Sequence, residues 1–316
     1  MLNDQTALNH ILVATDFSAH SQAALAQAVQ IADRTKATLS VVHVVTHVAL
    51  AVPGTSFEGH WRIPPGELKK AERQLRKEAE QQLADAIAPH RSSGRKLRTE
   101  TLVGVPFVEI IKMVQKKGID LVLAGTLGRT GLKRLLVGST AERLVRKCPC
   151  PVWIVKHGQQ VPPRTILNPV DFSEVSGRSS ELAAFLAERL DCALNVLHVI
   201  SSAADVEQEF ADPATMRLHR RDVKQAAAQR LSEFVSAHVP VGTTVDELVT
   251  LSEPWRSIDV IARSLDADLI VMGSMGRTGI PGFLIGNTAE KVLRLCDRSI
   301  LAVKPAGFVS PVHAEP

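Results

Sequence analysis

The sequence predicts an α/β protein made of two tandem, open, five-stranded parallel sheets flanked by helices, on three observations. The chain has 316 residues, about twice the length of an ordinary domain. With nine Phe, three Trp and no Tyr, its apolar mass must come mainly from Val, Leu, Ile and Ala, which is typical of buried parallel strands. The second half of the chain also repeats segments of the first half in the same order.

Four pairs of segments carry this repeat. ILVATDFS and ILNPVDFS begin at Ile11 and Ile166, and VVHVV around His43 recurs as VLHVI around His198. Further along, GTLGRTG at 125–131 recurs as GSMGRTG at 273–279, and GSTAERLVRKC at 138–148 recurs as GNTAEKVLRLC at 286–296. A polar, proline-containing run joins the copies. We therefore expect one domain over residues 1–157, a linker over 158–163 and a second domain over 164–316.

Within each copy, short β-branched runs alternate with helical periods, which predicts βαβ units. In the first copy the predicted strands lie near Ile11–Ala14, Leu39–Val45, Arg98–Leu102, Leu121–Ala124 and Val152–Val155. Between the second and third strands, apolar residues recur every four positions and predict a helix with one buried stripe: Ala71, Leu75, Ala79, Leu83 and Ile87. The second copy repeats this stripe at Val223, Ala227, Leu231 and Val235.

Composition narrows the class of protein. The 37 basic and 33 acidic residues are spread along the chain, so we expect no nucleic-acid partner. No apolar window is long enough for a membrane span and the first ten residues do not resemble a signal peptide, so we expect a cytoplasmic protein without a membrane span. We expect the four cysteines to be reduced and buried, with zinc or redox chemistry at Cys148 and Cys150 as the alternative.

An aspartate follows the first strand of each copy, Asp16 in one and Asp171 in the other. Ligands of open parallel sheets bind beyond the carboxyl ends of the strands, so either carboxylate could accept hydrogen bonds from a ribose or from a helix N-terminus. The alternative is structural: Asp16 could be the N-cap of the helix that starts near Ser18.

Spaced glycines form the strongest candidate site. Gly125 and Gly128 follow a strand, and nine residues later Gly138 and Ser139 open a helix. Glycines let backbone amides approach a phosphate, and residues 139–142 have the spacing of a capping box, which predicts a helix N-terminus that favours an anion. Cations are nearby at Arg129, Lys133 and Arg134. Glycines can also mark simple turns, but their occurrence in both copies favours an anion site.

At these residues the sequence resembles the universal stress protein family, and specifically its tandem, E-type members. The signature of that family, G-x2-G-x9-G-[S/T], is matched in full at Gly125, Gly128, Gly138 and Ser139, and the resemblance extends from about Ile11 to Pro305. The resemblance implies a Rossmann-like sheet of order 3-2-1-4-5, ATP binding with or without Mg²⁺, dimer-like pairing through the last strand, and a role in stress resistance.

The resemblance also implies a set of nucleotide contacts in the first copy. The nucleoside end would lie against Ala14, Thr15, Asp16 and the backbone of Val44. The ribose and phosphates would contact Gly125, Gly128, Arg129, Gly138, Ser139 and Thr140. The second copy departs from the signature, because Asn287 replaces the final Ser or Thr and only Arg277 supplies a cation in the loop. We therefore expect adenine nucleotide to bind mainly in the first domain.

Three functions remain open on these residues. The first is a regulatory protein that binds ATP or a related adenine nucleotide without efficient turnover, as an internal pseudo-dimer or a homodimer with regulatory protein partners. The second is an adaptor or chaperone-like protein whose second pocket takes an apolar or lipid-linked ligand, suggested by Ile280, Phe283, Leu284 and Ile285. The third is a slow ATPase, although no P-loop and no catalytic group can be identified.

His43 and His198 are expected to line the sites, with metal ligation or general-base roles as the alternative.

Overall fold

The computed structural model describes residues 8–46, 65–91, 96–126, 138–156, 158–201, 213–275 and 285–313. The chain forms two compact units. The first unit consists of residues 8–158 together with the segment that begins at Val309, and the second unit consists of residues 159–308.

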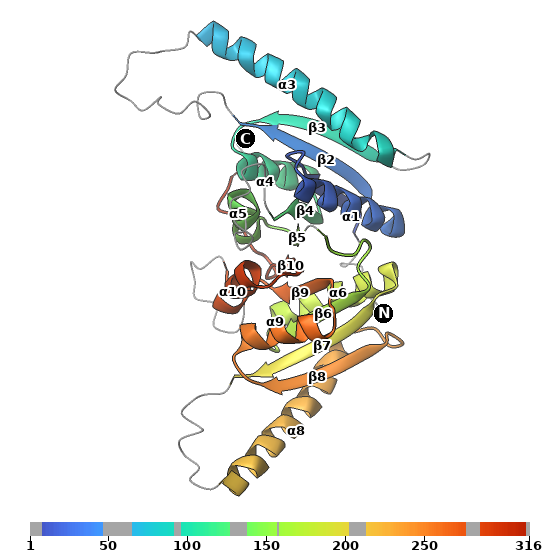
Figure 1. The fold of residues 1–316 in the computed structure, drawn as a ribbon, viewed down its shortest axis with the longest axis vertical. Coiled ribbons are helices and arrows are strands. Elements are labelled where there is room, and N and C mark those ends of the chain that lie inside the picture. Colours follow the sequence, from blue (N-terminus) through green and yellow to red (C-terminus); the bar gives the residue numbers. More distant parts are fainter. Residues whose placement is uncertain are drawn as a thin grey trace, which may run out of the picture. The chain divides into compact units, whose positions relative to one another are not determined.

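The first unit is a five-stranded parallel sheet of order β3-β2-β1-β4-β5 with helices packed against it (Figure 1). Its elements, in chain order, are β1 (His10–Ala14), α1 (Ala19–Thr35), β2 (Thr38–Val45), α3 (Pro65–Ile87), the 3₁₀ helix η2 (Ala88–His90), β3 (Leu97–Val103), α4 (Pro106–Lys117), β4 (Leu121–Gly125), α5 (Ser139–Lys147) and β5 (Val152–Val155). Each of the five predicted strands is confirmed to within one residue at either end.

The second unit repeats this topology, with parallel strands in the order β8-β7-β6-β9-β10. Its elements are β6 (Thr165–Val170), α6 (Glu174–Leu190), β7 (Ala193–Ile200), α8 (Pro213–His238), β8 (Val245–Leu251), α9 (Pro254–Ser264), β9 (Leu269–Gly273), α10 (Asn287–Leu295) and β10 (Ser299–Val303). The predicted α/β fold, with two tandem sheets and the 3-2-1-4-5 strand order, is confirmed. Within the described ranges, no helix combines the length and apolarity that crossing a membrane requires.

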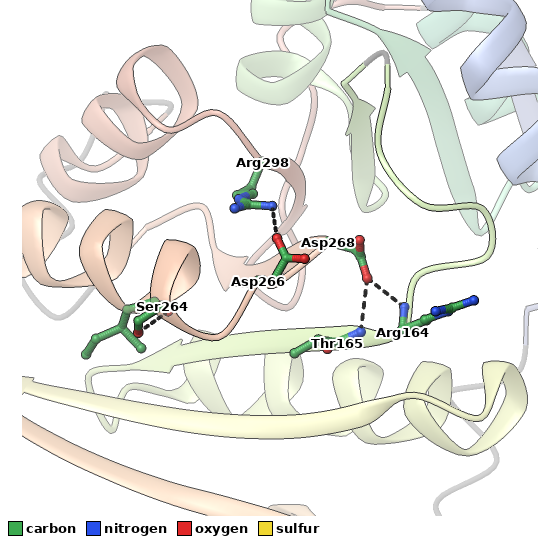
Figure 2. Close-up of polar contacts among 7 residues, drawn as sticks. Arg164, Thr165, Ser264, Asp266, Asp268 and Arg298 are labelled. Atoms are coloured by element: carbon green, nitrogen blue, oxygen red, sulfur yellow. Dashed lines mark hydrogen bonds and ion pairs between the residues drawn. The ribbon is translucent and has the colours of Figure 1, made fainter.

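An aspartate holds the start of the first strand of each unit. In the second unit, Asp268 Oδ2 accepts hydrogen bonds from the backbone N–H groups of Arg164 and Thr165, at 2.7 and 3.2 Å (Figure 2). In the first unit, Asp120 Oδ2 accepts from the backbone N–H groups of Asn9 and His10, both at 2.8 Å. These N–H groups lie at the strand entry and have a side-chain acceptor there, so the carboxylate fixes where the central strand begins.

The predicted buried stripe of α3 is only partly correct. Ala79, Leu83 and Ile87 are buried, but Leu75 is 41% exposed. The same holds in α8, where Leu231 and Val235 are buried while Val223 and Ala227 are only half-buried. The apolar period is therefore regular along both helices, but only their C-terminal parts pack fully on the sheet.

Gly125 is required by a close approach of two backbones. A Cβ atom at this position would lie 2.7 Å from the carbonyl carbon of His20 and 2.8 Å from the backbone nitrogen of Ser21. Real Cβ atoms essentially never come so close, and backbone atoms cannot rotate away. The glycine thus lets the end of β4 pack against the first turn of α1, a structural requirement that holds whether or not a ligand is present.

Candidate functional site

The first unit contains a cavity of about 520 Å³ at the carboxyl ends of its central strands. β1, β2 and β4 supply its floor, α3 and α4 contribute wall residues, and the first turn of α5 closes one side. Of the residues predicted to form a site, those that line this cavity are Ala14, Thr15, Asp16, Val44, Gly125, Gly138, Ser139 and Thr140. Gly128 and Arg129 lie outside the described residues, as do Lys133 and Arg134.

Asp16 organises the turn between β1 and α1, but it is not the N-cap of the helix. The N-cap is Ser18, whose hydroxyl accepts a hydrogen bond from the backbone N–H of Ser21. Asp16 Oδ1 instead accepts from the backbone N–H of Ser18 at 3.1 Å and from its hydroxyl at 2.6 Å. The N-cap interpretation of Asp16 is therefore wrong, because the helix begins two residues later than it requires and Asp16 braces the capping residue.

A histidine from β2 supports the same turn. The carbonyl oxygen of Thr15 can only accept, so the 2.8 Å contact assigns the proton to Nδ1 of His43. Phe17 stacks on the His43 ring with 4.5 Å between centroids, and it has a φ of 65°. A left-handed backbone is costly for an aromatic residue, so its presence here indicates that tertiary contacts hold the turn in place.

The first turn of α5 differs from the predicted capping box. Gly138, not Ser139, is the N-cap, and its carbonyl oxygen accepts the first helical hydrogen bond from Glu142 N–H at 2.9 Å. The Glu142 carboxylate pairs with Arg146 one turn later, at 3.1 Å. Ser139 is the first helical residue, so within the described residues no side chain caps this helix start. Amide N–H groups at such a start are suited to an anion, and they border the cavity.

The second unit contains a matching cavity of about 510 Å³. Asp171, His198, Gly286 and Asn287 line it at positions that correspond to Asp16, His43, Gly138 and Ser139 in the repeat. His198 Nδ1 donates to the carbonyl oxygen of Val170 at 2.9 Å. As in the first unit, a glycine is the N-cap of the helix. Gly286 caps α10, so Asn287, like Ser139, is the first helical residue.

The carboxylate of the second cavity accepts hydrogen bonds from two serines of the turn that follows it. Asp171 Oδ1 accepts from Ser173 N–H at 3.1 Å, from the Ser173 hydroxyl at 2.5 Å and from the Ser176 hydroxyl at 2.6 Å. As in the first unit, the residue after it, Phe172, has a positive φ, 63°. The Phe172 ring lies 4.1 Å from the His198 ring. Both copies thus build the same turn from the sequence DFS.

The long helices α3 and α8 contribute side chains to the two cavities that the sequence did not predict. Glu78, Ala79 and Gln82 of α3 line the first cavity, and Arg230 of α8 lines the second. One feature of the sequence could have indicated these positions. Glu78 and Arg230 each directly precede the first fully buried residue of the apolar stripe of their helix. The apolar period alone did not show that the next residue along the helix faces a cavity.

The prediction of an apolar lining for the second cavity falls mostly on residues outside the described ranges. Ile280, Phe283 and Leu284 lie outside the described residues, and Ile285 is buried but does not line the cavity. In the described ranges, His, Cys, Asp and Glu side chains nowhere gather in groups of three or more that could hold a metal ion. Cys148 and Cys150 are both buried, with 3.5 Å between their sulfur atoms.

Comparison with known proteins assigns both halves of the chain to one family. The model of the universal stress protein family matches residues 7–156 and again residues 163–304. A universal stress protein of Methanocaldococcus jannaschii is 36% identical over 154 residues, which are 49% of this chain and 85% of that protein. A universal stress protein of Mycobacterium tuberculosis is 27% identical over 290 residues, covering 90% of this chain and 92% of its own. The E-type homologue of Haemophilus influenzae is 27% identical over 61% of this chain and 64% of its own.

Solved structures agree with this assignment at the level of the fold. A universal stress protein from Archaeoglobus fulgidus superposes with a TM-score of 0.63 at 21% identity, covering 94% of this chain and 98% of its own. The fold is therefore shared, and the family-model matches to both halves show that the chain belongs to the universal stress protein family, as a member with two such domains in tandem.

Proposed function

We propose that this chain is a stress-response regulatory protein that binds ATP or a related adenine nucleotide in the cavity of the first unit. One observation carries the proposal: the turn at Asp16, the end of β2 at Val44 and the uncapped start of α5 at Gly138 all border a single cavity. A nucleotide needs a wall for its base, an acceptor for its ribose and donors for its phosphates. In the proposed pose, the end of β2 at Val44 is the wall for the base, Asp16 is the acceptor for the ribose, and the start of α5 supplies the donors for the phosphates.

The proposed pose follows the strand order. β1 lies between β2 and β4, so Val44 and the start of α5 border the cavity from opposite sides of β1. The start of α5 is held next to β4 by a hydrogen bond from Gly138 N–H to the carbonyl oxygen of Thr126, at 2.5 Å. The nucleoside end would thus lie toward β2 and the phosphates toward α5. Mg²⁺, if it accompanies ATP, would be held by the phosphates.

We further propose that ATP is bound rather than consumed. Fast hydrolysis needs a group that orients water and charge stabilisation that grows in the transition state. Asp16 Oδ1 accepts both donors of Ser18, and in the proposed pose this carboxylate lies at the ribose, away from the phosphates. The proposal places the protein in the cytoplasm, where adenine nucleotides are available and a buried thiol pair such as Cys148 and Cys150 stays reduced.

Calorimetric titration of the full chain with ATP, with and without Mg²⁺, tests the proposal. Gly138→Val, which places a branched side chain at the start of α5, should lower ATP affinity at least about tenfold because it blocks access to the amides. The matched change in the second unit, Gly286→Val, should lower it much less. Absence of ATP binding would refute the proposal, and equal losses would refute the preference for the first unit.

The rate of ATP hydrolysis is measured on the same protein variants. We expect hydrolysis far slower than the roughly 1–100 per second of kinases. A magnesium-dependent steady-state rate in that range, abolished by Gly138→Val, would instead make the protein an ATPase.

The charge of Arg230 in the second cavity argues against an apolar ligand there, because burying an unpaired charge against an apolar group is costly. The adaptor with a lipid-linked ligand is therefore not the function we favour.

A further inference from the structure

The long helices give the two cavities opposite charge at one equivalent position. In α3, Ala79, Leu83 and Ile87 are buried, and the same spacing of buried residues recurs at Leu231 and Val235 of α8 and at Val239, which directly follows that helix. Glu78 and Arg230 therefore occupy matching places, each one residue before the first of these buried positions. Each of the two side chains lines the cavity of its own unit. A carboxylate in the first cavity is thus replaced by a guanidinium in the second.

The structure holds the Arg230 guanidinium in place without neutralising it. Its Cζ lies 4.5 Å from the centroid of the Phe172 ring, which itself packs on His198 at 4.1 Å and meets Phe234 edge-on at 5.5 Å. Contact with a ring face uses none of the five N–H donors of arginine. Among the residues that the structure describes, Arg230 has no carboxylate partner. Its donors are therefore directed by packing but available to an acceptor.

The other charged group on this part of the cavity wall is already satisfied. Asp171 Oδ1 accepts from three donors of Ser173 and Ser176. In the first cavity, Glu78 accepts a hydrogen bond from Gln74 Nε2 at 2.7 Å and adds its charge to that of Asp16. A phosphate at this position would consequently be attracted in the second cavity and repelled in the first.

The strand order separates Arg230 from the start of α10. α8 packs on β7 and β8, whereas the start of α10 is held beside β9 by a hydrogen bond from Gly286 N–H to the carbonyl oxygen of Ser274, at 2.8 Å. β6 lies between β7 and β9. Arg230 and the first amides of α10 therefore border the second cavity from opposite sides of β6, and each favours an anion.

We propose that the second cavity binds a ligand with two separated phosphate groups, one at Arg230 and one at the start of α10, and that Glu78 excludes such a ligand from the first cavity. This inference deepens the proposed function: both cavities take nucleotides, but the second selects an additional phosphate at the nucleoside end. Arg230 and Glu78 are the residues that determine this selectivity.

Adenosine 3′,5′-bisphosphate and AMP are the probes, because they differ only in a phosphate on the ribose. Calorimetric titration of the full chain carrying Gly138→Val, which disables the first cavity, should show tighter binding of the bisphosphate by about tenfold. Adding Arg230→Gln should remove this preference by lowering the affinity for the bisphosphate about tenfold more than the affinity for AMP, and Arg230→Lys should retain most of the preference. Arg221→Gln, on the same helix but away from the cavity, should change neither affinity.

The converse variant tests the first cavity. In a chain carrying Gly286→Val, Glu78→Arg should raise affinity for the bisphosphate relative to AMP. Equal effects of Arg230→Gln on both probes, or no effect on either, would refute this inference while leaving Gly138-dependent ATP binding intact. If neither ATP nor the two probes bind, the inference and the proposed function both fail. Far-ultraviolet circular dichroism of each variant checks that the fold is retained.

Discussion

The Nδ1 of His43 donates a hydrogen bond to the carbonyl oxygen of Thr15 at 2.8 Å, and this bond ties the second strand of the sheet to the turn that follows the first. Phe17 covers the imidazole ring from the same turn. The second unit repeats the arrangement, with His198 on Val170 and Phe172 on His198. The histidine thus acts on the backbone of the turn that presents the aspartate to the cavity.

Replacing His43 with Phe should destabilise the first unit. Phenylalanine keeps a ring against Phe17 but cannot donate to Thr15, so about 1 kcal/mol of unfolding free energy should be lost. Differential scanning calorimetry measures the change in melting temperature. His198→Phe is the matched change in the second unit and should cost a similar amount. Unchanged melting in both variants would show that the hydrogen bond contributes nothing measurable.

Adding a methyl group at Gly125 should be more costly than adding one at Gly273. The Cβ of Gly125→Ala would meet backbone atoms of His20 and Ser21, whereas that of Gly273→Ala would first meet a side-chain methyl group of Val175 at 2.9 Å. Overpacking against backbone should cost about 2–3 kcal/mol, and the second variant less. Urea unfolding of both variants compares them. A larger loss for Gly273→Ala would contradict the steric explanation.

Asp268→Ala should destabilise the second unit by leaving two strand-entry amides without their acceptor. Arg164 and Thr165 both donate to this carboxylate, and bonds to a charged acceptor are stronger than neutral ones, so a loss of about 2 kcal/mol or more is expected. Asp120→Ala should have a comparable effect in the first unit. Hydrogen exchange at these amides provides the local readout. Protection that survives the substitution would mean that other groups hold the strand.

His10 should make stability depend on pH. Burial lowers the pKa of its imidazole below the ordinary value of 6.5, so the unfolded chain binds the proton more readily. Its contribution to stability is therefore complete above pH 6.5 and is lost as the pH falls through 6.5 toward the folded pKa. Unfolding at pH 7.5 and 5.5 should show a smaller loss for His10→Gln than for the unaltered chain. An equal loss would contradict this origin.

The thiols of Cys148 and Cys150 should resist modification in the folded chain. A hydrogen bond with Cys148, together with burial, raises the pKa of the Cys150 thiol well above its usual value. Because the thiolate is the reactive form, labelling at pH 8 should be on the order of 100-fold slower than in the denatured chain. Cys192, which is only half-buried, is the internal reference. Rapid labelling of Cys150 would point to redox chemistry instead.

Local patterns in the sequence determined the elements of the fold. Alternation of β-branched runs with helical periods located the strands, because strand and helix periods are set by the backbone itself. The repeated DFS and glycine segments likewise placed Asp16 at the carboxyl end of a strand and Gly138 at the start of a helix, and both border one cavity. Backbone geometry of this kind is readable from neighbouring residues.

Tertiary structure decided which neighbouring surfaces meet. The N-cap of α5 is Gly138 and not Ser139, which the capping-box spacing had predicted. Gly125 is required by the close contact between the end of β4 and α1. Tertiary structure also placed Glu78 and Arg230 on the cavity walls, although both look like ordinary exposed charges in a helical repeat. Periodicity gives the direction of a side chain relative to its own helix. Whether that direction ends in solvent or in a cavity depends on how the helix packs on the sheet, and residues far away in the sequence determine that packing.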